Sequence, residues 1–227
     1  MQIKVIYEDL DLIVIEKPPG TPSQRDPSGD PDVTSLLYMD YVGVIHRLDR
    51  PVGGVMVYAK TKEANSFLSR GVSTGGFHKE YLTIVSGKPQ NIYEEIKDYL
   101  RKDAGKSFSR VVDKNASAAK LAILEYRLLD SITIDNGEVL SLLNVVLKTG
   151  RHHQIRVQLS NQGLPIWGDT KYNPGFQNTN TWTQIGLWAY SLKFRLPNGK
   201  KRTFFSYPDN QYPWTLFNDT INKVKVE

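Results

Sequence analysis

The densest polar cluster of the sequence is His46-Arg47-Leu48-Asp49-Arg50, which precedes Gly53-Gly54 and the apolar run Val55 to Ala59. A carboxylate flanked by two arginines stays ionised, because nearby positive charge favours its charged form. An ionised carboxylate is what a nucleophile or a general base needs. The paired glycines allow a close backbone approach or unusual dihedral angles just after it. The alternative is a salt-bridged loop in front of a strand, and local composition alone favours that alternative.

Strand and helix signals lie on both sides of this cluster. Ile3 to Ile15 predicts an opening hairpin, which ends at Lys17-Pro18-Pro19-Gly20 because two prolines withhold backbone donors. After the apolar run, Thr61 is placed to cap a helix that ends at Gly75-Gly76. Tyr81 to Val85 is again typical of a strand.

The second half of the chain alternates turns and apolar runs in the same way. Asp135-Asn136-Gly137 is a hairpin turn signal, Arg151 to Gln162 predicts a helix, and Pro197-Asn198-Gly199 connects two short strands. The order shows no regular βαβ alternation, which argues against a doubly wound parallel sheet. We therefore expect an α+β fold. It would be a single domain over residues 1–227, with a mixed, mainly antiparallel central sheet flanked by helices.

Composition restricts the class of protein. The 227 residues include 40% hydrophobic and 23% charged residues, and a net charge of +5 is compatible with a polyanionic partner such as RNA. The absence of cysteine excludes disulfides, thiolate catalysis and cysteine-ligated zinc. Neither a signal peptide pattern nor an apolar run of about 20 residues is present. These features predict a soluble, cytoplasmic protein, which we expect to be a monomer.

A second cluster, Lys148 to Arg156, gathers donors and cations where a predicted strand meets the helix that begins at Arg151. Helix N-termini attract anions, including phosphates. On that helix, His152 and Arg156 would share a face because they are four residues apart. The alternative is a solvated, basic first turn. The adjacent histidines make the segment a poor zinc site, because they point about 100° apart on a helix.

Two shorter segments complete the candidates. Tyr81 begins an apolar strand, where core packing is the usual role of a tyrosine. Gly168-Asp169-Thr170-Lys171-Tyr172 is a polar turn whose cation and aromatic ring suit phosphate contact and base stacking. The sequence contains no phosphate loop, dinucleotide fingerprint or nucleophilic serine elbow.

Taken in order, these segments resemble the RluA-type family of RNA pseudouridine synthases. The main family signature runs His-Arg-Leu-Asp, two variable residues, Thr-Ser-Gly and an apolar strand that ends in Ala-Lys; His46 to Lys60 is similar to it. Further blocks that resemble the family follow the same order: Leu12 to Gly20, Lys79 to Tyr81, Thr149 to Val157, Pro165 to Tyr172 and Leu187 to Ala189. The resemblance covers nearly the whole chain and implies the pseudouridine synthase catalytic fold.

The chain departs from the family pattern at a few positions: Val52-Gly53 for Thr-Ser, His152 for Thr, Gln158 for His, and Trp188 for the later His. None of these changes removes an aspartate, tyrosine or arginine of the motifs, so they concern substrate details more than the reaction. Many relatives carry an S4 RNA-binding domain ahead of the catalytic one. Two residues precede the first predicted strand here, so we expect the catalytic domain without it.

The resemblance implies isomerisation of uridine in tRNA or rRNA to pseudouridine, with no metal and no cofactor. Asp49 would be the nucleophile and Tyr81 the residue that stacks on the base. Arg156 would be the cation beside Asp49, with Arg151 as the substitute. The candidates for holding flanking phosphates are His46, Arg47, Arg151 and Lys171. The uridine must leave its stack to reach Asp49, so base flipping is expected.

A non-catalytic RNA-binding protein on the same scaffold is the rival interpretation. The set of Asp49, Tyr81 and Arg156 argues against it, because binding a polyanion does not require a carboxylate. A metabolic enzyme that acts on a free nucleotide would instead predict a glycine-rich phosphate loop, which the sequence lacks.

Overall fold

The computed structural model describes residues 2–103, 105, 107–177 and 183–225. The chain forms two compact units. The first contains Met1–Glu80 and Trp188–Pro208, and the second contains Tyr81–Leu187 and Asp209–Glu227. The division into two units does not test the prediction of one domain over residues 1–227, which stays a prediction.

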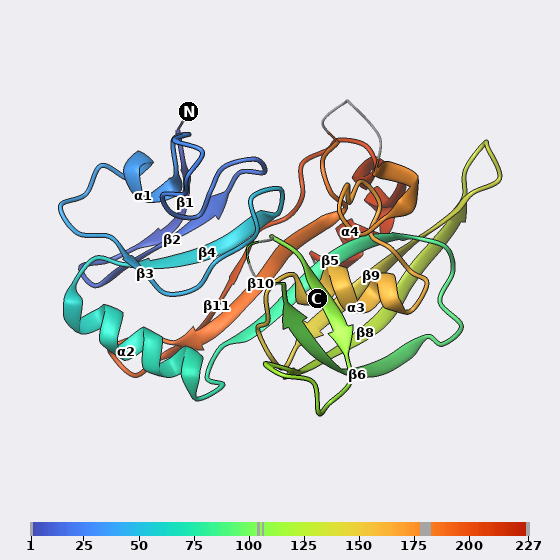
Figure 1. Cartoon of the computed structure of the whole chain (residues 1–227). Helices are drawn as coiled ribbons and strands as arrows, with labels where there is room; N and C mark the ends of the chain where they lie inside the picture. Colours follow the sequence, from blue (N-terminus) through green and yellow to red (C-terminus); the bar gives the residue numbers. More distant parts are fainter. Residues whose placement is uncertain (1, 104, 106, 178–182, 226–227) are drawn as a thin grey trace. The chain divides into compact units, whose positions relative to one another are not determined.

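The first unit is a mixed sheet with two helices (Figure 1). Its strand order is β1-β2-β4-β10; β3 pairs with β4, and β11 with β10. The β4–β10 pair is parallel, whereas β1–β2, β2–β4 and β10–β11 are antiparallel. The elements are β1 (Lys4–Glu8), β2 (Leu12–Lys17), α1 (Val33–Leu36), β3 (Gly43–Val44), β4 (Gly53–Ala59), α2 (Lys62–Ser73), β10 (Leu187–Arg195) and β11 (Lys201–Phe205).

The core of this unit lies between the sheet and α2. Every residue of β4 is buried, and Ala64 and Leu68 of α2 belong to the same apolar cluster as Leu12 and Val57. Helix α2 begins where the sequence predicts, because the hydroxyl of Thr61 accepts a hydrogen bond from the amide of Ala64 at 3.1 Å. The predicted opening hairpin is likewise confirmed.

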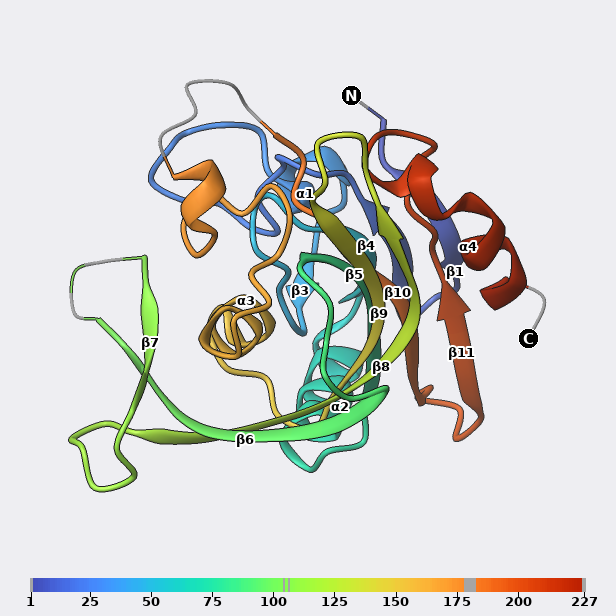
Figure 2. The same cartoon turned by 90° about the vertical axis from the view of Figure 1, so that its right-hand side faces the viewer.

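The second unit consists mainly of long antiparallel strands in the order β5-β9-β8-β6-β7. Helix α3 contacts β6 and β7 and lies within the curve of these strands (Figure 2). The elements are β5 (His78–Ser86), β6 (Tyr93–Lys102), β7 (Ser109–Val112), β8 (Lys120–Thr133), β9 (Val139–Leu147), α3 (Gln154–Asn161), η1 (Pro174–Phe176), η2 (Trp214–Phe217) and α4 (Asn218–Val224). Strand β5 begins at the end of the first unit and continues into the second.

One predicted boundary is wrong in a way that matters for the site. The helix expected from Arg151 begins at Gln154, because His153 adopts a left-handed conformation with φ of 54°. The side chain of Gln154 caps the preceding turn by accepting hydrogen bonds from the amide of Arg151 at 2.9 Å and the hydroxyl of Thr149 at 2.8 Å. His152 therefore lies outside the helix, and the expectation that it shares a helix face with Arg156 is wrong.

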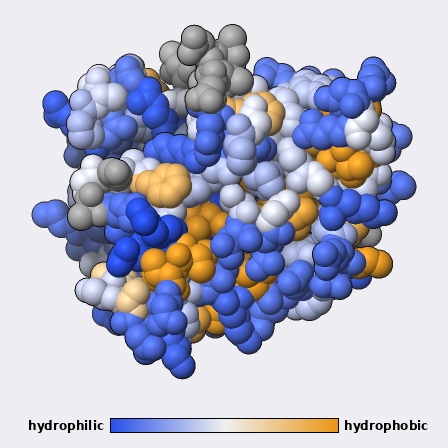
Figure 3. All heavy atoms as spheres, turned by 45° about the vertical axis from the view of Figure 1, so that its right-hand side comes forward, coloured by the Kyte–Doolittle hydropathy of each residue, from blue (hydrophilic) through white to orange (hydrophobic). Residues whose placement is uncertain are grey.

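Hydrophilic side chains cover most of the face drawn in Figure 3, and apolar side chains gather in smaller clusters between them. Among the described residues, no helix is both long enough and apolar enough to cross a bilayer.

Candidate active site

The Asp49 segment, residues 46–54, leads into strand β4 in the first unit. Asp49 is half-buried in a turn that is closed by a hydrogen bond from the amide of Val52 to its carbonyl at 3.0 Å. Arg47 and Arg50 on either side are exposed. Arg50 turns away to the loop that follows β2, where it donates to the carbonyl of Gly20 at 3.0 Å and pairs with Asp30. Arg50 therefore fixes the loop that follows β2.

Lys17, at the end of β2, is the buried cation of this segment. Its ammonium donates to the carbonyl oxygens of Pro18, Thr21 and Arg50 at 2.9, 2.7 and 3.1 Å. Burial lowers the pKa of Lys17 to about 7, and the negative charge of Asp49 opposes that shift. Lys17 thus ties the Pro-Pro-Gly turn to the residue after Asp49. Its role was missed in the sequence, although a lysine between an apolar strand and two prolines was a visible signal.

His46, the first residue of the segment, is a neutral group whose ring contacts strand β4. Its Nε2 accepts a 3.4 Å hydrogen bond from the amide of Val57, so the proton is on Nδ1. This Nδ1 is buried and has no hydrogen-bond partner among the described residues. Burial, followed by the positive charge of Lys79, holds the pKa of His46 well below its usual range. A phosphate contact by His46 would therefore use a neutral donor.

The Arg156 segment, residues 149–156, lies in the second unit and is organised around a buried ion pair. Arg156 donates from Nε and Nη2 to the two carboxylate oxygens of Asp169 at 2.8 and 2.7 Å, and both side chains are almost fully buried. The carboxylate of Asp169 also accepts from the amides of Lys171 and Tyr172 at 2.9 and 3.2 Å. A bidentate pair of this kind fixes the plane of the guanidinium.

An aromatic layer covers this ion pair. The guanidinium of Arg156 lies 5.2 Å from the ring centre of Tyr172, whose hydroxyl accepts from the amide of Ser109 at 2.8 Å. The same hydroxyl is hydrogen-bonded to Nδ1 of His153 at 2.8 Å. Burial, and then the charge of Arg156, lower the pKa of His153 to about 2. His152 stacks on His153 with ring centres 3.8 Å apart and contacts Ser109 through Nδ1.

The remaining predicted residues of the second unit lie nearer the surface or at its boundary. Arg151 is exposed and donates to the carbonyl of Leu121 at 2.9 Å, while the exposed Lys171 donates to the carbonyl of Ser107 at 2.8 Å. Tyr81 is buried at the point where β5 enters this unit. The structure therefore brings the guanidinium of Arg156 and the backbone amide of Lys171 to Asp169, while the ammonium of Lys171 contacts Ser107. The meeting of Asp49 with Tyr81 and Arg156 stays a prediction.

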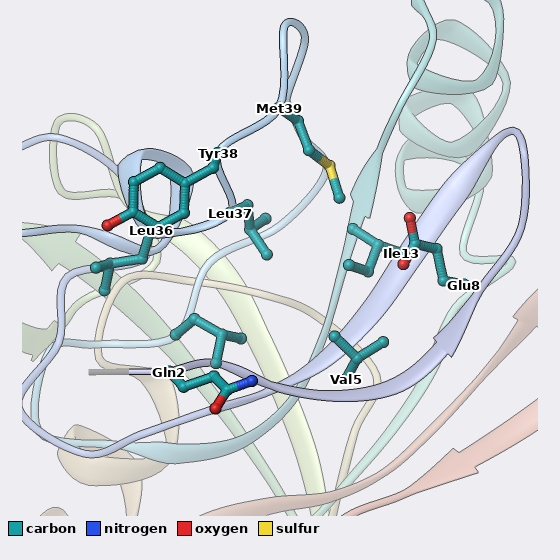
Figure 4. Close-up of a pocket in the computed structure, with 9 residues that line it drawn as sticks. Gln2, Val5, Glu8, Ile13, Leu36, Leu37, Tyr38 and Met39 are labelled. Carbon is teal, nitrogen blue, oxygen red and sulfur yellow. The ribbon is translucent and has the colours of Figure 1, made fainter.

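A shallow cavity of about 500 Å³ lies elsewhere in the first unit (Figure 4). It is lined by strand β1 and the segment after α1, including Val5, Glu8, Leu37 and Met39. None of the predicted site residues lines it. Among the described residues, no group of three or more His, Cys, Asp or Glu is arranged to hold a metal ion.

Comparison with known proteins identifies the family. The family model described as RNA pseudouridylate synthase matches residues 11–161, which contain both the Asp49 segment and the Arg156 segment. The chain belongs to the RNA pseudouridylate synthase family. The resemblance to RluA-type enzymes is thereby confirmed.

Curated members of the family extend well beyond this chain. The ribosomal large subunit pseudouridine synthase C of Rickettsia bellii is 35% identical over 173 residues, which are 74% of this chain and 56% of that protein. The ribosomal large subunit pseudouridine synthase D of Borreliella burgdorferi is 33% identical over 214 residues, which are 87% of this chain and 62% of that protein. The chain thus spans roughly 56–62% of the length of these relatives.

Solved structures agree on the fold. The structure of human RNA pseudouridylate synthase domain containing 1 superimposes with a TM-score of 0.77 at 18% identity, covering 96% of this chain and 94% of that one. Human RNA pseudouridylate synthase domain containing 4 gives a TM-score of 0.74 at 23% identity, covering 98% and 93%. The predicted α+β fold with a mixed, mainly antiparallel sheet is confirmed.

Two departures from the motifs of this pseudouridylate synthase family are in contact in the structure. Gly53 lies opposite Trp188 in the β4–β10 pair, and a Cβ on Gly53 would come within 2.2 Å of the indole ring. Trp188 is buried and donates from Nε1 to the hydroxyl of Ser206 at 3.1 Å. The indole therefore fills the space that a serine side chain at position 53 would need. Gly54 is constrained separately, with φ of 125° and a hypothetical Cβ 2.2 Å from the carbonyl oxygen of Ala189.

Proposed function

We propose that this chain isomerises uridine in RNA to pseudouridine, with Asp49 as the catalytic carboxylate. In this reaction the bond between N1 and C1′ breaks, the uracil turns, and a bond forms between C5 and C1′. C5 loses a proton and N1 gains one, so no external reagent is consumed. Asp49 assists the cleavage as a nucleophile or as a base. Tyr81 stacks on the uracil, and the reaction uses neither a metal nor a cofactor.

The observation that best supports this function is the construction of the Asp49 segment. Its turn is held by the hydrogen bond from Lys17 to the carbonyl of Arg50, and its Gly53 packs closely against the indole of Trp188. The segment is therefore fixed by groups that lie outside it, the ammonium of Lys17 and the indole of Trp188. Pre-positioning of a reactive group is a large part of enzymatic rate enhancement.

The substrate proposed is ribosomal RNA of the large subunit, because the relatives from Rickettsia bellii and Borreliella burgdorferi are named for that activity. Transfer RNA is the second candidate. Arg47, Arg151 and Lys171 are exposed cations suited to flanking phosphates. The predicted phosphate contact of His46 would use its neutral Nδ1–H, which is buried in this structure. We further propose that the protein works in the cytoplasm as a monomer.

Substitution of Asp49 tests the function. Asp49→Asn and Asp49→Ala should abolish pseudouridine formation in a transcript of large-subunit ribosomal RNA, because the carboxylate carries out the chemistry. The melting temperature and the affinity for RNA should stay close to those of the unchanged protein. Nucleoside analysis by mass spectrometry measures the product. Full activity in either variant would remove Asp49 from the mechanism, and an inactive unchanged protein that binds RNA would support the non-catalytic alternative.

A further inference from the structure

The outward face of the β10–β11 hairpin carries a group of cations and an exposed ring. Along β10, Leu192 and Phe194 are buried in the core, whereas Lys193 and Arg195 are exposed between and after them. The register pairs Arg195 with Lys201, Lys193 with Thr203, and Ser191 with Phe205. Side chains of directly paired residues lie on the same face of a sheet. Lys193, Arg195, Lys201 and Phe205 therefore share one face, here called the hairpin face (β10 and β11 in Figure 2).

The charge on this hairpin is unbalanced. Residues 191–207 include five basic residues and no Asp or Glu: Lys193, Arg195, Lys200, Lys201 and Arg202. None of the five forms an ion pair with a carboxylate within the part of the chain that the structure describes. Arg195 and Lys201 are directly opposed like charges, an arrangement that destabilises a strand pair. An anion bound across the pair would remove this repulsion.

Aromatic rings adjoin the cations. Phe205 is 49% exposed, and its ring is nearly parallel to that of Tyr207, with ring centres 6.3 Å apart and 8° between the planes. Exposed aromatic rings beside cations suit single-stranded nucleic acid, because bases stack on the rings while phosphates meet the cations. A protein partner with an apolar surface would instead need a continuous apolar patch, which these alternating cations interrupt.

We propose that the hairpin face binds an unpaired stretch of RNA, with Lys193, Arg195 and Lys201 on phosphates and Phe205 stacked on a base. The proposal rests on the proposed function, because it takes RNA as the substrate class. It adds a binding surface on β10 and β11, separate from the residues of the sequence motifs assigned to phosphate contact. Such a surface would hold the strand that flanks the target and so contribute to the choice of uridine.

Binding measurements with matched charge variants test the proposal. The hairpin variant is Lys193→Gln, Arg195→Gln and Lys201→Gln, and the control variant is Lys62→Gln, Arg70→Gln and Lys88→Gln, which removes equal charge from other exposed positions. The probe is a single-stranded RNA rich in uridine, with a duplex of the same length for comparison. The hairpin variant should bind the single strand at least about tenfold more weakly at low salt. Its slope of log affinity against log salt should become shallower by about 2, from three lost contacts at roughly 0.7 each.

Phe205→Ala separates stacking from charge. It should weaken single-strand binding about fivefold or more without changing the salt slope, and should have little effect on the duplex. Melting temperatures confirm that each variant is folded, and single substitutions at Lys193 or Lys201 replace the triple variant if it is not. Equal RNA affinities for the hairpin and control variants would overturn the proposal. Loss of self-association in sedimentation, with RNA affinity retained, would also overturn it, because the face would then contact a second copy.

The RNA-binding measurements are designed so that their outcome does not depend on catalysis. All binding is measured in the Asp49→Asn background, so turnover does not alter the RNA. If Asp49→Asn and the unchanged protein are both inactive but the hairpin variant still loses RNA affinity, the proposed reaction fails and the hairpin face stands. If the Asp49 test succeeds and the hairpin variant binds like the control, the reaction stands and the hairpin face fails.

Discussion

The Asp49 segment and the Arg156 segment carry similar charges but are held in place by different means. Lys17 fixes the first through the carbonyl oxygen of Arg50 and joins it to the carbonyl oxygens of Pro18 and Thr21 in the neighbouring loop. The second is fixed through a side-chain ion pair, in which Asp169 takes both arms of the Arg156 guanidinium. In the first segment the carboxylate of Asp49 is the proposed reactive group, and the ammonium of Lys17 holds the turn through a backbone carbonyl. In the Arg156 segment, the guanidinium that is predicted to act in the site also holds the segment in place through its ion pair with Asp169.

This difference predicts how each segment responds to substitution. A change at Asp49 should alter chemistry and leave stability nearly intact. A change at Arg156 should alter stability first, because it leaves a buried carboxylate without its partner. Activity measurements on Arg156 variants are therefore informative only beside a stability measurement.

The largest expected effect on stability comes from the Arg156–Asp169 pair. Arg156→Ala should lower the free energy of unfolding by about 3–5 kcal/mol, because Asp169 remains buried and unpaired. Arg156→Lys should lose less, since it keeps the charge but not the bidentate fork. Urea denaturation of both variants, of Asp169→Ala and of the double variant measures the coupling. Additive losses, or a total loss under about 1 kcal/mol, would show that the pair behaves like one at the surface.

The same variants test the predicted meeting of Arg156 with Asp49. If the two meet, loss of the arginine raises the pKa of Asp49, because a nearby cation favours the ionised carboxylate. Activity of Arg156→Ala should then be low near neutral pH and recover in part as the pH rises. The activity of Arg151→Ala, measured over the same pH range, is the control. An unchanged pH profile in Arg156→Ala would point to Arg151 as the partner.

The next effect concerns the contact between Gly53 and Trp188. Gly53→Ala should destabilise the protein by about 1–3 kcal/mol, because the added methyl group would lie within 2.2 Å of the buried indole. In a Trp188→His background the same substitution should cost clearly less, since a smaller ring makes room. Gly54→Ala is the matched contrast, because it meets backbone atoms of Ala189 and cannot be rescued at position 188. If Gly53→Ala lowers the stability equally in both backgrounds, the indole of Trp188 is not what excludes a side chain at position 53.

The sequence predicted the fold class and most strands, because their alternating apolar residues and turn signals are local. It missed strand β6, whose inward positions include the polar Asp98 between Ile96 and Leu100. Asp98 is tolerated there because Gln158 of α3 donates to it at 2.9 Å. That partner lies sixty residues further along the chain, so no local pattern could reveal it.

The candidate site was likewise predictable only in part. Motif residues were found by resemblance, whereas Lys17 and Asp169, which hold the two segments, were quoted in motifs without a role. Their roles depend on burial and on distant carbonyl or guanidinium groups, which a sequence does not display. The start of α3 was misplaced for a similar reason. His153 has a left-handed conformation and contacts Tyr172, a residue of a distant segment that no local pattern points to.

The most gradual expected effect is a pH dependence of the free energy of unfolding that arises from Lys17. Its pKa is about 7 in the folded protein and about 10.5 when exposed in the unfolded chain. Between these values the unfolded chain binds more protons, so the free energy of unfolding rises with pH, by at most about 1.4 kcal/mol per pH unit. Lys17→Met has no such group. The difference in unfolding free energy between the unchanged protein and Lys17→Met should therefore grow in favour of the unchanged protein as the pH rises from neutral toward 10.5.

Two controls locate the origin of this dependence. Lys62→Met removes an exposed lysine, and its curve should stay parallel to that of the unchanged protein. Asp49→Asn removes the negative charge that opposes the lowered pKa of Lys17, so its pH dependence should begin at a lower pH. A constant difference between the unchanged protein and Lys17→Met would show that the amine is not desolvated. If Asp49→Asn does not move the pH dependence, the charge of Asp49 does not affect the pKa of Lys17. Lys17 would then hold the loop through backbone carbonyls alone, in clear contrast to the ion pair of Arg156.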